Sequence, residues 1–238
     1  MKRINCFIPF QDAAQVAHTV KGLKESDLVS KIYLLATETV SDAPEGCTVV
    51  PVQSLNSTDA VRKIAALADA DYTMLYTKYT SLELGMFALE RMLHIADDSA
   101  AGMVYADHYI VTNGTAKNNP VISYQQGSLR DDFNFGSVLI YNTSVLKEAV
   151  AQMTADYQFA GLYDLRLKAS QKASLVHINE YLYSEVEQDT RKSGEKIFDY
   201  VDPKNRAVQI EMEEACTQHL KAIGGFLAPE FRQIEFNA

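Results

Sequence analysis

A short polar segment directly follows an apolar stretch in the first half of the chain, where ligand chemistry is expected. Residues 72–76 form an apolar run typical of a buried strand, and residues 77–81 are polar. In open α/β sheets, ligands bind beyond the carboxyl ends of strands, so this turn is a candidate site. Its one charged residue, Lys78, either neutralises a phosphate as a point charge or is a solvated turn lysine.

Other candidate side chains lie in the second half of the chain. Asp107 ends a predicted strand, where it either contacts a substrate or closes a turn through backbone hydrogen bonds. Asp164 begins a predicted helix, where it serves as a general base or as an aspartate favoured by the helix dipole. A loop between them is either part of the same site or a salt-bridged structural loop, and it contains Arg130, Asp131, Asp132 and Asn134.

The composition and the missing motifs exclude several function classes. A net charge of −9 argues against a nucleic-acid-binding surface. The five histidines lack zinc-site spacing, and the three cysteines are too far apart for a CxxC site. The GxGxxG, GxxxxGK[ST] and GxSxG motifs do not occur, which disfavours dinucleotide oxidoreductases, P-loop enzymes and α/β-hydrolases.

No segment of the sequence predicts membrane insertion or secretion. There is no run of about 18 apolar residues. The apolar segment 4–10 is too short for a signal peptide and is followed at once by polar residues. We therefore expect a cytoplasmic protein with free cysteines.

The first hundred residues alternate between predicted strands and helices. Compact apolar runs predict strands at residues 4–10, 31–36, 47–52 and 72–76. Helices are expected after Asp12, after Ser57 or Thr58, and from about Leu82, with apolar positions every three or four residues. Because helices connect successive strands, we expect a mainly parallel sheet with right-handed crossovers.

The second half predicts a hairpin and then further alternation. A strand over residues 102–111 runs into Asn113-Gly114, a strong hairpin signal, with residues 121–124 as the expected return strand. The remaining expected elements are a strand at 135–141, a helix from Asn142 or Thr143 to Met153, a helix at 163–170, a strand at 175–183, a loop at 189–206 and a helix at about 208–223. One domain over residues 1–223 and a tail over 224–238 is the simplest organisation.

Several of these segments, in order, resemble family 2 glycosyltransferases, which have the GT-A fold. Residues 72–85 match the length and pattern of that family's strand, Asp-x-Asp turn and Glu-Pro-Gly-like helix start, with Glu83 and Gly85 in register. The other matching segments are Phe7-Ile-Pro-Phe10 with the strand end that contacts the nucleobase, Met103–Asp107 with Val-Tyr-Ala-Asp, Phe135-Gly-Ser137 with Phe-Gly-Ser, and Leu162–Leu167 with the region that supplies the catalytic base.

The chain departs from that family at its acidic positions. Thr77-Lys78-Tyr79 replaces the Asp-x-Asp that holds the metal, and residues 36–39 lack the aspartate that reads uracil. Tyr163-Asp164 replaces Glu-Asp. We therefore expect no cofactor, since Mg or Mn would need carboxylates other than the usual pair.

The resemblance implies an α/β GT-A (nucleotide-diphospho-sugar transferase-like) fold, with a central, mostly parallel mixed sheet and helices on both faces. Residues 1–100 would be the nucleotide-binding half, 101–187 the acceptor half, and 188–223 a loop and C-terminal helix. Asp164 is the expected catalytic base. The expected substrate-binding residues are Pro9, Phe10, Lys78, Asp107, Arg130, Asp131, Asp132 and Asn134.

Two functions fit these observations, and the sequence does not decide whether the chain is an enzyme. The first is transfer of a sugar from a nucleotide-sugar donor to a glycan acceptor. The second is a catalytically degenerate GT-A-like domain that binds a partner, beside a second catalytic domain or as a homo-oligomer. The enzyme hypothesis expects Asp107, Asp132 and Asp164 to face one shared cleft.

Overall fold

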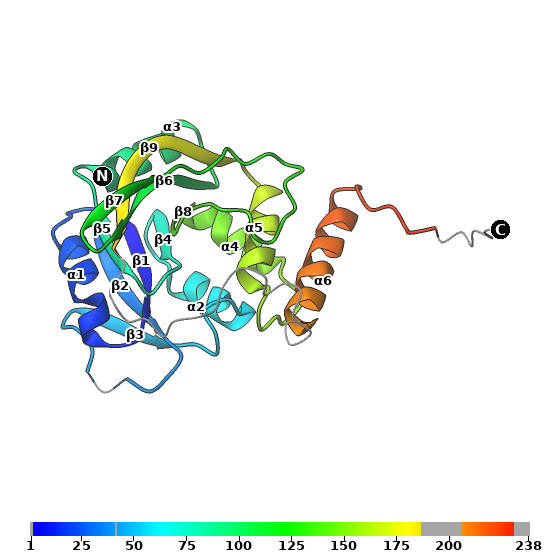
Figure 1. The fold of residues 1–238 in the computed structure, drawn as a ribbon. Coiled ribbons are helices and arrows are strands. Elements are labelled where there is room, and N and C mark those ends of the chain that lie inside the picture. The colour runs from blue at the N-terminus through cyan, green and yellow to red at the C-terminus, as the bar shows by residue number, and fades with distance from the viewer. Residues whose placement is uncertain (1, 41, 187–205, 231–238) are drawn as a thin grey trace, which may run out of the picture.

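The computed structural model describes residues 2–40, 42–186 and 206–230. Nine strands form one sheet in the order β3-β2-β1-β4-β8-β6-β9-β5, with β7 paired to β6 (Figure 1). The strands are β1 Ile4–Phe10, β2 Val29–Ala36, β3 Cys47–Pro51, β4 Tyr72–Tyr76, β5 Ser81–Leu84, β6 Met103–Thr112, β7 Thr115–Asn119, β8 Val138–Asn142 and β9 Leu175–Val186. The helices are α1 Ala13–Lys24, α2 Thr58–Leu67, α3 Ala88–Asp98, α4 Thr143–Ala151, α5 Gly161–Ser170 and α6 Arg206–Ala222.

The sheet has a parallel half and a mixed half. Strands β3, β2, β1 and β4 are all parallel, as expected for the first hundred residues. Strand β8 runs antiparallel to both β4 and β6, while β9 is parallel to β6 and antiparallel to β5. The sheet is therefore mixed, as expected, with parallel pairing among β1 to β4 and between β6 and β9.

Helices cover both faces of the sheet. Alternate residues of β1 point to opposite faces, so Ile8 packs with α1 and α3, and Phe7 packs with α2 and α4. Helix α5 lies on the α2 and α4 side, and α6 packs on α5 (Figure 1). No helix of the described residues is long and apolar enough to cross a membrane.

Strands β1 and β4 separate near their carboxyl ends, which opens the sheet where a site is expected. Strand β1 pairs with β2 as far as Phe10, but with β4 only as far as Phe7. Pro9 lies beyond the last β4 pair, so its missing N–H leaves no gap in that ladder. This explains why a central strand tolerates a proline.

The predicted helix from Leu82 is wrong, because residues 81–84 form strand β5. This strand pairs antiparallel with β9, and the Leu82 backbone N–H donates to Thr19 Oγ1 at 2.9 Å. Helix α3 begins only at Ala88, after Phe87 in a left-handed conformation with φ 56°. Met86, one of the apolar positions with helical spacing after Leu82, is 88% exposed. Pairing with the edge of β9 therefore makes residues 81–84 a strand.

The Asn113-Gly114 turn is confirmed, but its return strand is earlier than expected. Both residues have positive φ, 52° and 74°, which suits a two-residue hairpin turn. Thr115 therefore faces Thr112 directly, and β7 ends at Asn119. Residues 121–124, the expected return, form no strand. The predicted loop at 189–206 lies outside the described residues except for Arg206, which begins α6.

Candidate functional site

The turn after β4, residues 77–80, borders two pockets. Tyr79 lines a pocket of about 620 Å³ at the ends of β1 and β2, which we call the β1–β2 pocket. Thr77 lines a second pocket of about 420 Å³, which we call the aromatic pocket because Phe133, Phe135 and Phe159 form part of its wall. A ligand lying across this turn would thus reach a pocket on either side.

The β1–β2 pocket is built from strand ends and the start of α1. Asp12 caps α1 by accepting from the Gln15 backbone N–H at 2.9 Å, and the Gln15 side-chain amide donates to the Tyr79 carbonyl at 3.0 Å. The helix thereby fixes the turn. Three carboxylates line the pocket and no lysine or arginine does among the described lining residues. The pocket suits an uncharged group better than a phosphate.

The aromatic pocket combines closely packed aromatic rings with polar groups. The Phe133 and Phe135 ring centroids are 4.5 Å apart. Gly136 also lines the pocket with φ 72°, and a Cβ there would clash with the Tyr183 hydroxyl. Asp131, Asp132 and Asn134 supply polar side chains from the preceding loop. Rings beside carboxylates and an amide are the groups that bind sugar faces and hydroxyls.

Arg166 of α5 also lines the aromatic pocket, although it is only 5% exposed. Its guanidinium carbon lies 4.7 Å from the Tyr163 ring centroid and 5.4 Å from that of Phe135. Its N–H groups donate to backbone carbonyls of Ser128 and Arg130, at 3.4 and 2.9 Å. These bonds hold the loop that carries the polar groups of the pocket.

Lys78 reaches away from both pockets to strand β9. Its Nζ lies 2.6 Å from Glu185 Oε2, and the other carboxylate oxygen lies 3.1 Å from His108 Nε2. Burial raises the pKa of Glu185, but hydrogen bonds from His108, Lys78 and Ser137 outweigh it and lower that pKa to about 2. Glu185 is therefore ionised at neutral pH and balances the charge of Lys78.

Asp107 is buried, has hydrogen-bond partners inside the protein and lines neither pocket. Its side chain is 2% exposed, and Oδ1 accepts from the Val121 backbone N–H at 2.9 Å and lies 2.8 Å from His177 Nε2. The carboxylate thus ties the segment after β7 to β9.

Asp164 is also buried, at 1% exposed, and lines neither pocket. Burial raises the pKa of its carboxyl group, and Lys168, with Nζ 3.6 Å away on the next turn of α5, opposes that shift. Neither carboxylate oxygen has a hydrogen-bond partner among the described residues. The expectation that Asp107, Asp132 and Asp164 face one shared cleft is therefore wrong for the described residues, because the first and last are buried inside the protein and only Asp132 lines a pocket.

The remaining sequence candidates fall into four settings. Phe10 lines the β1–β2 pocket, while Pro9 is buried within β1. Asp131, Asp132 and Asn134 come together in the aromatic pocket. Arg130 is exposed and binds Asp132 with two hydrogen bonds, at 2.8 and 2.6 Å, so it serves the loop itself.

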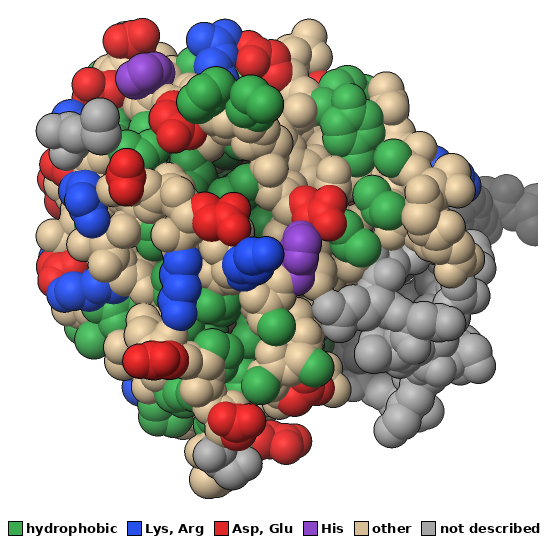
Figure 2. Space-filling view, turned by 90° about the vertical axis from the view of Figure 1, so that its left-hand side faces the viewer, with side chains coloured by type: hydrophobic (Ala, Val, Ile, Leu, Met, Phe, Trp, Pro, Cys, Tyr) green, Lys and Arg blue, Asp and Glu red, His purple; other side chains and the backbone are tan. Residues whose placement is uncertain are grey.

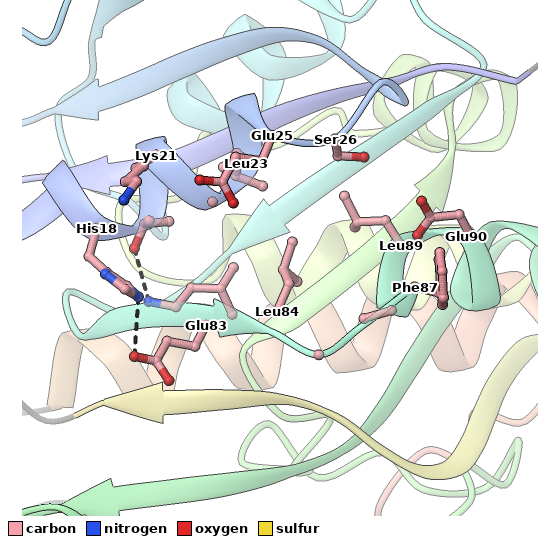
Figure 3. Close-up of a pocket in the computed structure, with 15 residues that line it drawn as sticks. His18, Lys21, Leu23, Glu25, Ser26, Glu83, Leu84, Phe87, Leu89 and Glu90 are labelled. Carbon is pink, nitrogen blue, oxygen red and sulfur yellow. Dashed lines mark hydrogen bonds and ion pairs between the residues drawn. The ribbon is translucent and has the colours of Figure 1, made fainter.

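Sequence reasoning did not identify Arg166, Glu185 or a third pocket. That pocket, of about 510 Å³, lies between α1 and the β5–α3 connection, where His18 Nε2 is 3.1 Å from Glu83 Oε1 (Figure 3). On this side of the molecule acidic and basic side chains are interspersed (Figure 2). The only sequence signal for Arg166 is weak: it lies one helical turn from Leu162, which lines the same pocket. No local signal indicates a role for Glu185, because its partners Lys78 and His108 are distant in sequence.

The residues at the turn do not fit a divalent metal. Thr77, Lys78 and Tyr79 offer no carboxylate, and an ammonium group beside the site would repel a cation. No group of three or more histidine, cysteine, aspartate or glutamate residues in the described parts of the chain has metal-binding geometry.

Comparison with known proteins supports the fold. No family model and no curated protein matches the chain. A crystal structure of S. aureus TarS, residues 1–349, is similar with a TM-score of 0.54 and 10% identity, covering 77% of this chain and 60% of that one. A second TarS structure, in complex with UDP-GlcNAc, gives a TM-score of 0.60 and 12% identity, covering 92% and 66%.

These two comparisons establish the architecture of the chain. The α/β fold with a mixed sheet matches the two TarS structures, so the GT-A fold expected from the resemblance is confirmed. The chain spans less than two thirds of the length of either TarS structure. At 10–12% identity the likeness applies to the fold alone.

Proposed function

We propose that this chain is a glycosyltransferase whose nucleotide-sugar donor lies across the turn at residues 77–80. The observation that carries the proposal is the position of this turn between two pockets, with Tyr79 lining one and Thr77 the other. The nucleoside would occupy the β1–β2 pocket, and the acceptor would occupy the aromatic pocket. Transfer would then take place beside Thr77.

In this proposal, a lysine of the protein neutralises the diphosphate in place of a metal ion. Lys78 is the charged residue of the turn, and its side chain is 48% exposed, so it can turn toward a ligand. A diphosphate would compete with Glu185 for the ammonium group. The donor therefore binds without Mg or Mn, because the turn has no carboxylate to hold either.

Asp131 is the better placed general base for the acceptor hydroxyl. It lines the aromatic pocket, whereas Asp164 lines neither pocket and is 1% exposed. Asp132 lines the same pocket, but its pKa is lowered by the hydrogen bond from Arg130, which makes it a weaker base. The catalytic role expected for Asp164 would require the acceptor to reach a buried carboxylate.

A binding domain without catalysis is the second candidate, and two observations favour it. The charge of Lys78 is already balanced by Glu185, and the lining of the β1–β2 pocket is acidic. Both features weaken diphosphate binding. In this case the aromatic pocket binds a glycan, and no sugar is transferred.

Thermal unfolding with nucleotides and nucleotide sugars separates the two candidates. UDP, UDP-GlcNAc and the corresponding guanosine compounds are tested at millimolar concentration, with and without Mn or Mg. A folded-state ligand at 100 times its Kd stabilises the protein by about 2.7 kcal/mol, which raises Tm. An enzyme requires a metal-independent increase in Tm with one nucleotide, and sugar release or transfer from the matching donor.

Variants at the turn link that result to the proposed site. Tyr79→Ala and Lys78→Ala should remove the increase in Tm, while Lys117→Ala, an exposed lysine on β7, should keep it. If no nucleotide raises Tm, the glycosyltransferase proposal fails and the binding domain remains. Binding of a nucleotide sugar without turnover also favours the binding domain.

A further inference from the structure

Arg166 is a buried cation without a counter-ion in the described parts of the chain. The residue is 5% exposed, and its guanidinium donates to two backbone carbonyls and lies against aromatic rings. These carbonyls engage two of the five N–H donors that a guanidinium carries. No carboxylate of the described residues forms an ion pair with it. The other buried cation on α5, Lys168, has Asp164 3.6 Å away.

The surrounding rings compensate only part of the cost of burying this charge. The guanidinium carbon lies within 6 Å of the ring centroids of Tyr163, Phe135 and Tyr124. Such cation–π contacts are weaker than the cost of burying a charge without a partner. An anion brought into the aromatic pocket would complete the arrangement, since the planar guanidinium fork suits carboxylate and phosphate oxygens.

The other charged groups of the pocket leave this position open to an anion. Asp132 is held by Arg130 through two hydrogen bonds and is neutralised locally. Asp131 is exposed, so it stands on the solvent side of the pocket, whereas Arg166 is on the buried side. The pocket thus has a cation inside, a carboxylate outside and aromatic rings between them.

We propose that the aromatic pocket binds a sugar that carries an anionic group, a carboxylate or a phosphate, with this group on Arg166. The rings contact the apolar face of the sugar, and Asp131 accepts hydrogen bonds from its free hydroxyl groups. The inference rests on the proposed function only in naming this sugar as the acceptor. Binding itself requires no nucleotide.

Calorimetric titration with four simple probes tests this assignment. Glucose, glucuronate, glucose 6-phosphate and inorganic phosphate are titrated at pH 7.5 into the full chain. At least one anionic sugar should bind about tenfold or more tightly than glucose, since charge-assisted bonds to arginine are roughly twice as strong as neutral ones. The better of glucuronate and glucose 6-phosphate identifies the anionic group. Equal binding of glucose, or equal binding of phosphate and glucose 6-phosphate, overturns the proposal.

Matched variants assign the preference to Arg166. Arg166→Gln should reduce the preference for the anionic sugar to less than about twofold, and Arg91→Gln, which removes an exposed guanidinium outside the pocket, should leave it within about twofold. An unchanged preference in Arg166→Gln overturns the proposal. Because Arg166 also supports the loop, circular dichroism and Tm of each variant are recorded first.

A second variant keeps the test valid if Arg166→Gln does not fold. Asp131→Asn changes an exposed side chain and removes the negative charge nearest to solvent, so it should strengthen binding of the anionic sugar by about two- to fivefold at low salt. No change, or weaker binding with unchanged glucose affinity, contradicts the charge arrangement. Anionic sugar binding without any nucleotide binding would refute the glycosyltransferase proposal and leave this one standing. Nucleotide binding without any anionic preference would do the reverse.

Discussion

Lys78 Nζ lies 2.6 Å from Glu185 Oε2, which joins the turn after β4 to the end of β9. The two residues differ in exposure, with the Lys78 side chain 48% and the Glu185 side chain 3% exposed. Glu185 is therefore the fixed partner and Lys78 the adaptable one. An ion pair within the protein therefore holds the one charged side chain of this turn.

Glu185→Gln should release Lys78 for a ligand while weakening the fold. Without the carboxylate, the ammonium charge is available, so a nucleoside diphosphate should bind several-fold more tightly. The loss of a buried charged hydrogen-bond partner should cost about 1–3 kcal/mol of unfolding free energy. Titration calorimetry and urea unfolding measure the two effects.

Glu180→Gln is the matched control on the same strand. Glu180 is exposed and pairs with Arg91, so its loss should change stability by less than about 1 kcal/mol and leave nucleotide affinity unchanged. If Glu185→Gln binds the diphosphate no better than the native chain, Lys78 does not take part in donor binding.

The same ion pair predicts a loss of stability in acid. The pKa of Glu185 is about 2 in the folded protein, below its ordinary value of 4.5. The unfolded chain therefore binds the proton more readily, so this stabilisation is present above pH 4.5 and is lost as pH falls toward 2. The contribution is about 1–3 kcal/mol, allowing for the half-exposed Lys78.

Urea unfolding between pH 7 and pH 2.5 measures this contribution. The difference in unfolding free energy between the native chain and Glu185→Gln should shrink across this range, because the variant lacks the titrating group. A difference that stays constant with pH would show that Glu185 is not the group responsible.

Asp164→Asn should change stability at neutral pH only slightly and leave any transferase activity nearly unchanged. Burial raises the pKa of Asp164, so the ionised form is disfavoured in the folded state, and stability rises as pH falls through that pKa. Removing the carboxylate ends this cost but also leaves the buried Lys168 without its counter-ion, so the two effects oppose each other and the unfolding free energy should change by less than about 1 kcal/mol. A rate loss of about 100-fold or more would instead identify Asp164 as the general base.

Local sequence signals predicted most elements of the fold, and failed where a distant strand decided the structure. The Asn113-Gly114 turn and the Asn142 cap of α4 act within a few residues, and both are present. Leu82 and Met86 have helical spacing, but pairing with β9 makes residues 81–84 a strand. Nothing near Leu82 in the sequence reports that β9 lies beside it.

The candidate site shows the same difference between residues placed by local sequence and residues placed by distant contacts. Asp131, Asp132 and Asn134 are neighbours in one loop, so their common position in the aromatic pocket was expected from the sequence. The expectation that Asp107 ends a strand is wrong, because it lies within β6, where its partner His177, 70 residues away, holds it in the interior. Arg166 becomes a candidate only when the fold shows that it has no carboxylate partner among the described residues.

Gly136→Ala should damage the aromatic pocket more than any other small substitution in its loop. Its φ of 72° is unfavourable for alanine, and the new Cβ would meet the Tyr183 hydroxyl and lie 3.2 Å from His108 Nδ1. Left-handed backbone strain at a residue with a side chain costs about 1–3 kcal/mol, to which the steric contact adds. Urea unfolding should therefore show a loss of at least about 2 kcal/mol.

Two further variants separate backbone strain from the steric contact. Gly127→Ala lies nearby in the chain, has no neighbouring atom within 4 Å of the added Cβ, and should change stability by less than about 1 kcal/mol. Tyr183→Phe removes the hydroxyl that accepts from the Ser137 backbone N–H at 2.9 Å, so it is destabilising alone. In the double variant with Gly136→Ala, however, the total loss should be smaller than the sum of the two single losses. Additive losses would mean that the hydroxyl does not restrict position 136, and that strain at φ 72° alone makes glycine necessary there.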